Sequence, residues 1–131
     1  MRLIRYQSRA EPACFGWVYD DKVGPIEGNP FAEFRRQEAL IPLETVRLLP
    51  PVVPGKIICV GRNYAEHAKE HQAAVPDVPL LFLKPPSSVI GPGQTIILPP
   101  QSQQVEHEAE LVVEIGKRGR WIDPADAGHH I

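Results

Sequence analysis

The sequence predicts a mostly β protein of the α+β class, arranged as a roll or sandwich of short strands. The chain contains 15 Pro among 131 residues, about twice the usual share, and Pro interrupts helices and central strands alike. Apolar residues also occur in many short runs, while the segments with a helical pattern are few and short. Because 43% of the residues are hydrophobic, the chain can bury a core and is not expected to be disordered.

Residues 1–50 are predicted to form a small β-rich domain. Its expected elements are strands at residues 2–7, 14–19 and 23–26 and a short helix at residues 31–40. Asp20 and Asp21 supply the turn between the second and third strands. Pro residues at positions 42, 50, 51 and 54 follow, so we place a domain boundary near residue 50.

Residues 51–131 are predicted to form a second unit that begins with a buried strand. Its expected elements are strands at residues 56–60, 80–84, 95–98 and 107–115 and one helix at about residues 64–71. Asn63 is placed to cap that helix, and Glu66 stands three residues later, where a capping carboxylate belongs. Pro- and Gly-rich turns separate these elements, which favours a mostly β roll.

Composition and charge exclude several classes of function. The net charge of −2 argues against a nucleic-acid partner, and the basic block at residues 117–120 is expected to be a solvated turn. No apolar run approaches the roughly 20 residues of a membrane span, and the N-terminus turns polar too soon for a signal peptide. Cys14 and Cys59 have no metal or redox spacing. We therefore expect buried free thiols in a cytoplasmic protein.

Glu108 and Glu110 are the most informative pair of residues. On the predicted strand at residues 107–115, side chains two positions apart leave the same face, so the two carboxylates would point together. Their mutual repulsion would be relieved by a divalent cation with a preference for oxygen ligands. The alternative is the solvent face of an edge strand, on which Glu114 would continue the alternation.

His67 and Glu70 form a second candidate site on the predicted helix. Residues three apart lie on one face of a helix and can touch. A carboxylate beside an imidazole holds its orientation and raises its basicity, as a general base requires. A plain surface pair remains the alternative, because Glu66 and Lys69 make the helix polar throughout.

Lys84 is a weaker candidate at the end of a predicted strand. Its ammonium group could bind a substrate carboxylate, although a solvent-facing lysine is the commoner case. A zinc site is not expected, because the His and Cys spacing does not support one. His107 is adjacent to Glu108 and should therefore face away from any metal.

Four segments in register resemble the fumarylacetoacetate hydrolase family. The matching segments are residues 56–70, 81–86, 89–93 and 107–111. The resemblance implies a small N-terminal domain followed by the first part of a mixed β-sandwich roll, with the catalytic domain spanning residues 51–131. It also leans towards the bacterial isomerases and hydrolases of aromatic-compound catabolism, such as the 2-hydroxyhepta-2,4-diene-1,7-dioate isomerases.

The resemblance also implies roles for the candidate residues. His67 and Glu70 would be the catalytic dyad on a lid, and Glu108 and Glu110 would bind Mg²⁺ or Mn²⁺. The implied reaction is C–C bond hydrolysis, tautomerisation or decarboxylation of small diketo acids or 2-hydroxy-diene-dioates through a metal-stabilised enolate. A homodimer of the longer enzyme is expected by the same resemblance.

The family's third metal carboxylate and its later substrate lysine are not found in this sequence. We therefore expect the catalytic domain to be incomplete at its C-terminal side, and Asp123 and Asp126 do not match the missing ligand. An alternative is a truncated, catalytically inactive product with only a binding or interaction role. The isolated chain is expected to show no turnover, because two carboxylates and waters should hold Mg²⁺ weakly.

Overall fold

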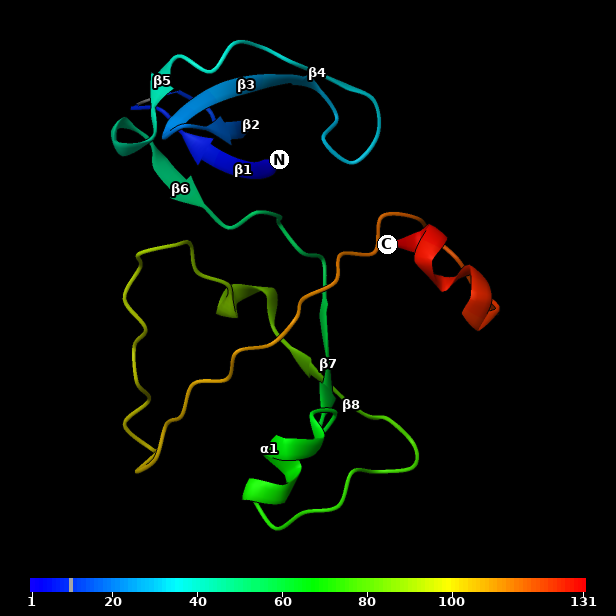
Figure 1. Cartoon of the computed structure of the whole chain (residues 1–131). Coiled ribbons are helices and arrows are strands. Elements are labelled where there is room, and N and C mark those ends of the chain that lie inside the picture. The colour runs from blue at the N-terminus through cyan, green and yellow to red at the C-terminus, as the bar shows by residue number, and fades with distance from the viewer. Residues whose placement is uncertain (10) are drawn as a thin grey trace.

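The chain folds into two separate antiparallel sheets, one in each half of the sequence (Figure 1). A computed structural model describes residues 1–9 and 11–131. Strands are the main regular elements, and the helical segments are short, so the predicted mostly β class is confirmed. Among the described residues, no helix is long and apolar enough to cross a membrane.

The N-terminal half forms a six-stranded sheet. Its strands are β1 (Arg2–Gln7), β2 (Cys14–Tyr19), β3 (Lys22–Gly28), β4 (Phe34–Arg36), β5 (Ile41–Pro42) and β6 (Arg47–Leu49). The order is β4-β3-β2-β1-β6, and β5 pairs with the other end of β3. The three strands predicted at the start of the chain are confirmed, and Asp20 and Asp21 form their turn with positive φ values of 44° and 57°.

Tyr6 and Val23 are the buried centre of this sheet, with exposed fractions of 2% and 0%. Gly16 lies between them, and a Cβ atom there would meet the Tyr6 ring at 2.8 Å and Val23 at 2.9 Å. Tyr6 also faces Cys14 across the β1–β2 pair. Burial and a hydrogen bond with the Cys14 side chain raise the pKa of the Tyr6 phenol well above its ordinary value.

The helix predicted at residues 31–40 is wrong, because this segment pairs with β3 instead. Strand β4 runs antiparallel to β3, with Phe34 opposite Gly28 and Arg36 opposite Ile26. The Asn29 side chain accepts a hydrogen bond from the Phe31 backbone N–H at 3.0 Å, which favours a turn over a helix start. Cross-strand pairing thus outweighs a local helical pattern of only ten residues.

The second half contains a two-stranded sheet and one α-helix. Its elements are β7 (Ile57–Gly61), α1 (Ala65–Glu70), β8 (Leu80–Lys84) and the 3-10 turns at Pro86–Ser88 and Pro124–His130. A further 3-10 turn at Leu43–Thr45 precedes β6. The predicted strands at 56–60 and 80–84 and the helix near 64–71 are confirmed. Both Cys residues are free thiols, but they are half-buried and not fully buried as predicted.

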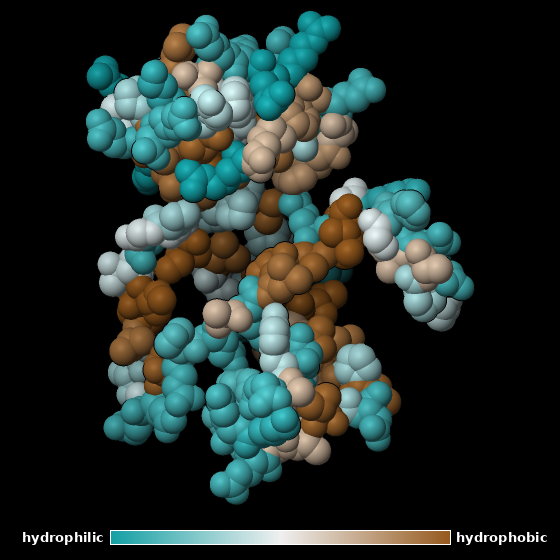
Figure 2. All heavy atoms as spheres, in the orientation of Figure 1, coloured by the Kyte–Doolittle hydropathy of each residue, from teal (hydrophilic) through white to brown (hydrophobic). Residues whose placement is uncertain are grey.

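The strands predicted at residues 95–98 and 107–115 are not formed. Both segments run without strand pairing in the described part of the chain, and Ile97 and Leu111 are 87% and 82% exposed. Exposed apolar residues cluster on the surface of the part of the chain that follows β6 (Figure 2). A strand needs a neighbour that satisfies its backbone groups, and an apolar pattern alone cannot provide one.

A turn in the second half touches the N-terminal half at Gly91. This glycine is buried, and a Cβ atom there would lie 3.2 Å from the Leu48 carbonyl oxygen and 3.3 Å from Pro50. The contact therefore joins the chain after β8 to the exit of β6, and only a residue without a side chain fits it comfortably.

Candidate active site

Helix α1 presents the candidate catalytic residues directly after strand β7. Between the two elements, Arg62 adopts a positive φ of 56°, a sharp change of direction after Gly61. The N-cap is Tyr64, without a capping bond from its side chain, so the predicted cap at Asn63 is wrong. Glu66 does not close a capping box either, because it pairs with the Lys69 ammonium at 2.6 Å. Ala68 is the buried residue of this helix, with an exposed fraction of 2%.

His67 lies between two carboxylates. Its Nε2 is 3.1 Å from Oε1 of Glu108, and its Nδ1 is 3.6 Å from Oε2 of Glu70. Both contacts are within the distance of an ion pair, and the one to Glu108 is the shorter. Sequence analysis predicts the dyad and the glutamate pair as two sites, and the structure brings the dyad together with Glu108 but not with Glu110.

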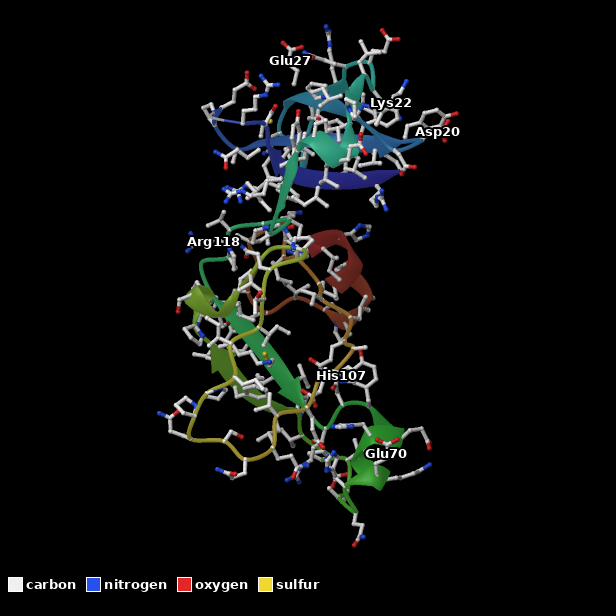
Figure 3. All side chains as sticks on the ribbon, turned by 90° about the vertical axis from the view of Figure 1, so that its left-hand side faces the viewer. Asp20, Lys22, Glu27, Glu70, His107 and Arg118 are labelled. Carbon is white, nitrogen blue, oxygen red and sulfur yellow. The ribbon has the colours of Figure 1, made fainter. Side chains whose placement is uncertain are left out.

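Helix α1 lies beside the extended segment that carries Glu108. In Figure 3, Glu70 lies on α1 and His107 lies on the neighbouring segment. The side chains of His67 and Glu108 are 41% and 52% exposed, so solvent and a small ligand can reach both. A half-exposed imidazole with one nitrogen held by a carboxylate has the chemistry of a general acid or base.

Two further side chains near this cluster were missed by sequence reasoning, one against His67 and one against the segment that carries Glu108. The His71 ring packs edge-on against His67, with ring centroids 4.6 Å apart. The Tyr64 hydroxyl accepts a hydrogen bond from the Leu111 backbone N–H at 3.0 Å. The four-residue spacing from His67 to His71 was a usable helical signal, whereas no local pattern links Tyr64 to a residue 47 positions away.

Glu110 is exposed and makes no hydrogen bond or ion pair within the described residues. Among those residues, no cluster of three or more His, Cys, Asp or Glu side chains could hold a metal. Glu108 and Glu110 nevertheless offer hard oxygen donors of the kind that Mg²⁺ and Mn²⁺ prefer. The donor chemistry fits these ions, with two protein ligands that waters or a bound substrate would have to supplement.

Lys84 stands apart from the cluster. It ends β8 opposite Ile57, and its ammonium group lies 6.0 Å from the centroid of the Phe82 ring. No contact joins it to His67 or to Glu108 within the described part of the chain. Its predicted contact with substrate therefore remains a prediction.

Two family models match the chain in succession. Residues 56–131 match the model described as fumarylacetoacetate (FAA) hydrolase C-terminal. Residues 1–51 match the model described as Rv2993c-like, N-terminal. The first range includes α1 and the segment with Glu108, and the second covers the six-stranded sheet.

A curated protein and a solved structure are also similar to this chain. Oxaloacetate tautomerase FAHD2A, mitochondrial, from Bos taurus is 47% identical over 96 residues, which are 72% of this chain and 31% of that protein. The structure of a protein from Mycobacterium abscessus superimposes with a TM-score of 0.82 at 36% identity, covering 99% of this chain and 51% of the other.

A third relative is the 5-carboxymethyl-2-hydroxymuconate delta-isomerase from Mycobacterium smegmatis. Its structure gives a TM-score of 0.64 at 34% identity, covering 79% of this chain and 40% of that one. The chain thus spans about a third of the length of the curated relative it matches and about half or less of these solved structures.

Proposed function

Because the chain belongs to the fumarylacetoacetate hydrolase family, we propose that it supplies the catalytic dyad and two metal ligands of a metal-dependent hydrolase or isomerase. The proposed substrates are small diketo acids or 2-hydroxy-diene-dioates. The activity would belong to a longer enzyme of which these residues form part, since the matched 96 residues make up 31% of the curated relative.

The position of His67 between Glu70 and Glu108 is the observation that carries this proposal. Two carboxylates from separate segments that meet at one imidazole can hold its ring in one orientation. The same arrangement is useful where a proton must be moved next to a bound cation. It therefore favours catalysis over a plain surface pair.

His67 would act as the general acid or base. Glu70, on the same helix, would keep the ring oriented through Nδ1, while Nε2 faces the reaction side at Glu108. In an isomerisation, His67 would accept a proton from the carbon next to a carbonyl and return it elsewhere on the substrate. In a hydrolysis, the same nitrogen would accept a proton from the attacking water.

Glu108 and Glu110 would hold Mg²⁺ or Mn²⁺, because both offer carboxylate oxygens and both are open to solvent. When bound, such a cation supplies positive charge for oxygen atoms that become negative during the reaction. Lys84 would add a second positive charge for the substrate carboxylate. Closure of α1 over the substrate would limit the access of water, as in other lid-bearing enzymes.

The names of the relatives favour isomerisation or tautomerisation as the reaction class. One relative is named an oxaloacetate tautomerase, and another is named a hydroxymuconate isomerase. Both names describe movement of a proton within a carbonyl acid, which needs the same residues as the step above. We propose this class ahead of C–C hydrolysis and decarboxylation, within a cytoplasmic and homodimeric enzyme of aromatic-compound catabolism.

A second candidate function is a binding or interaction role without catalysis. It is favoured by the absence of a three-ligand metal cluster among the described residues and by the exposed apolar residues of the second half. In that case the 131-residue chain would be an inactive product of its own. Its metal affinity would be weak, and no substrate would be turned over.

The two functions are separated by assays at two chain lengths. The intact mass of the protein in extracts of its source identifies the natural length, and that form is assayed with oxaloacetate and with acylpyruvates, with and without Mg²⁺. We expect Mg²⁺-dependent turnover by a form heavier than 14.6 kDa and none by the 131-residue chain. Changing Glu108 and Glu110 together to Ala should abolish the Mg²⁺-dependent activity, and Glu66→Gln serves as the control. Retained activity and Mg²⁺ dependence in the double variant would refute the site.

A further inference from the structure

Tyr64 joins the start of α1 to the segment that carries the two glutamates. Its hydroxyl oxygen accepts a hydrogen bond from the Leu111 backbone N–H at 3.0 Å. Leu111 directly follows Glu110, so the bond acts at the end of the proposed pair of metal ligands. Neither residue has a role in the function proposed above.

The segment at residues 105–115 has little else to hold it. It makes no strand pairing, and among the described residues the bond to Tyr64 is the one hydrogen bond made by its backbone groups. Its apolar side chains are open to solvent, Leu111 being one of them. The place of Glu108 near α1 therefore depends on a few polar contacts instead of a packed core.

The contacts of Tyr64 with Leu111 and of His67 with Glu108 are in register. Tyr64 and His67 are three positions apart at the start of α1, and their partners Leu111 and Glu108 are three positions apart on the segment. The helix start and the segment thus run antiparallel, with Tyr64 opposite Leu111 and His67 opposite Glu108. Fixing the first contact brings the second within reach, because the segment between them is short.

We propose that Tyr64 is a positioning residue that fixes residues 108–111 against α1 and so sets the contact of Glu108 with His67. This inference rests on the proposed function for its meaning, since it assigns a support to the proposed dyad and metal ligands. Tyr64 would not touch the substrate. It would act through the Leu111 backbone on the carboxylate of Glu108.

The test is made on the 131-residue chain with ¹³C-labelled histidine at one fixed pH. The His67 ring signal is identified by its loss in His67→Asn. The position of that signal in Glu108→Gln shows where it lies when the contact with the Glu108 carboxylate is removed. We expect Tyr64→Phe to move the signal to the position seen in Glu108→Gln. The double variant Tyr64→Phe/Glu108→Gln should show the His67 signal at the same position as Glu108→Gln alone, because the two residues act on one contact.

A second variant removes the same hydrogen bond from its other side. Leu111→Pro lacks the backbone N–H and changes a side chain that is already exposed, so it should reproduce the effect of Tyr64→Phe. Tyr19→Phe is the matched control, because Tyr19 is also an exposed tyrosine but lies on β2. Far-UV circular dichroism of both test variants checks that neither has lost its fold.

Affinity for Mn²⁺ alone provides a second readout. Loss of one exposed hydrogen bond should weaken Mn²⁺ binding roughly two- to tenfold in Tyr64→Phe and leave Tyr19→Phe unchanged. A His67 signal that stays at its wild-type position in Tyr64→Phe would overturn the inference. If the 131-residue chain holds Mn²⁺ too weakly to measure, the His67 signal alone decides the role of Tyr64, and the proposed metal site is decided by the double variant of the natural-length enzyme.

Discussion

Nε2 of His67 lies 3.1 Å from Oε1 of Glu108, which joins two candidate sites that are far apart in the sequence. The contact makes the imidazole and the proposed metal ligand a single chemical unit. A proton on His67 and a cation at Glu108 would each be affected by the other, because both act on the same carboxylate. A substitution in α1 or in the segment that carries Glu108 should therefore affect both the proton on His67 and the cation at Glu108.

Removing the general acid or base should abolish catalysis without unfolding the helix. In the natural-length enzyme, His67→Asn is expected to lower kcat by about 10²- to 10⁴-fold, the usual contribution of such a group. Glu70→Gln should cause a smaller loss, because it orients the ring from 3.6 Å without touching substrate. Steady-state kinetics with oxaloacetate measure both.

Glu66→Gln is the control for those variants. Glu66 is on the same helix but pairs with Lys69, and both side chains are largely exposed. Kinetics close to those of the wild type are expected. A loss in Glu66→Gln as large as in Glu70→Gln would mean that charge on α1, and not the orientation of His67, is what matters.

Alkaline pH should destabilise the N-terminal sheet through Tyr6. Because burial raises its pKa in the folded protein, the neutral phenol is favoured by folding. The resulting stability is fully present below the unfolded pKa of about 10 and is lost as the pH rises from there towards the folded pKa. Urea midpoints from pH 8 to 11 should fall more steeply for the wild type than for Tyr6→Phe. Equal slopes for the wild type and Tyr6→Phe would contradict the role of Tyr6. Tyr19→Phe, which changes an exposed tyrosine of β2, should retain the wild-type slope.

Gly24 should tolerate no side chain. A Cβ atom there would lie 2.6 Å from the Gln37 carbonyl oxygen and would also collide with the Trp17 indole, which donates to that same oxygen at 2.9 Å. Gly24→Ala is expected to lower the free energy of unfolding by about 1–3 kcal/mol. Thermal unfolding followed by Trp fluorescence measures the change.

Gly55→Ala is the matched control for that substitution. A Cβ atom at Gly55 would meet nothing within 4 Å. Replacing it should be neutral or slightly stabilising, since Ala restricts the unfolded chain. Equal losses at the two positions would show that backbone freedom, and not the space beside Trp17, limits Gly24.

The β7–β8 sheet should make the isolated 131-residue chain prone to self-association. Partners in register share a face, so Ile58, Val60, Leu81 and Leu83 form one aliphatic face, of which Leu83 is 70% exposed. Such a face and two open strand edges favour association. Light scattering at rising concentration should detect it, and Leu81→Lys with Leu83→Lys should reduce it. The equivalent double change at Tyr19 and Leu40, exposed in the N-terminal half, should have little effect.

Much of the fold was predictable because its signals are local. Alternating residues and a two-Asp turn predicted the strands that became β1, β2 and β3, and a short apolar run predicted β7. The helix at residues 31–40 failed because pairing of β4 with β3 depends on a partner that no short window contains. The strand at residues 107–115 failed for the complementary reason, since its apolar pattern is present but its partner is not among the described residues.

The candidate site was predictable in its parts but not in its assembly. Helical spacing relates His67 to Glu70, and two-residue spacing relates Glu108 to Glu110. The bond from Leu111 to Tyr64 and the contact of His67 with Glu108 follow from the path of the chain in space. Such long-range contacts depend on the whole fold, so no residue pattern near either end could reveal them.

The distance along the chain between Tyr64 and Leu111 also has a consequence for the order of folding. Their bond closes a loop of 47 residues, whereas the β1–β2 and β2–β3 hairpins join neighbouring segments. Contacts of low sequence separation form early, and long loops close late because closure costs entropy before it is rewarded. During synthesis on the ribosome, the N-terminal hairpins would therefore form well before His67 meets Glu108, and the candidate site would assemble after them.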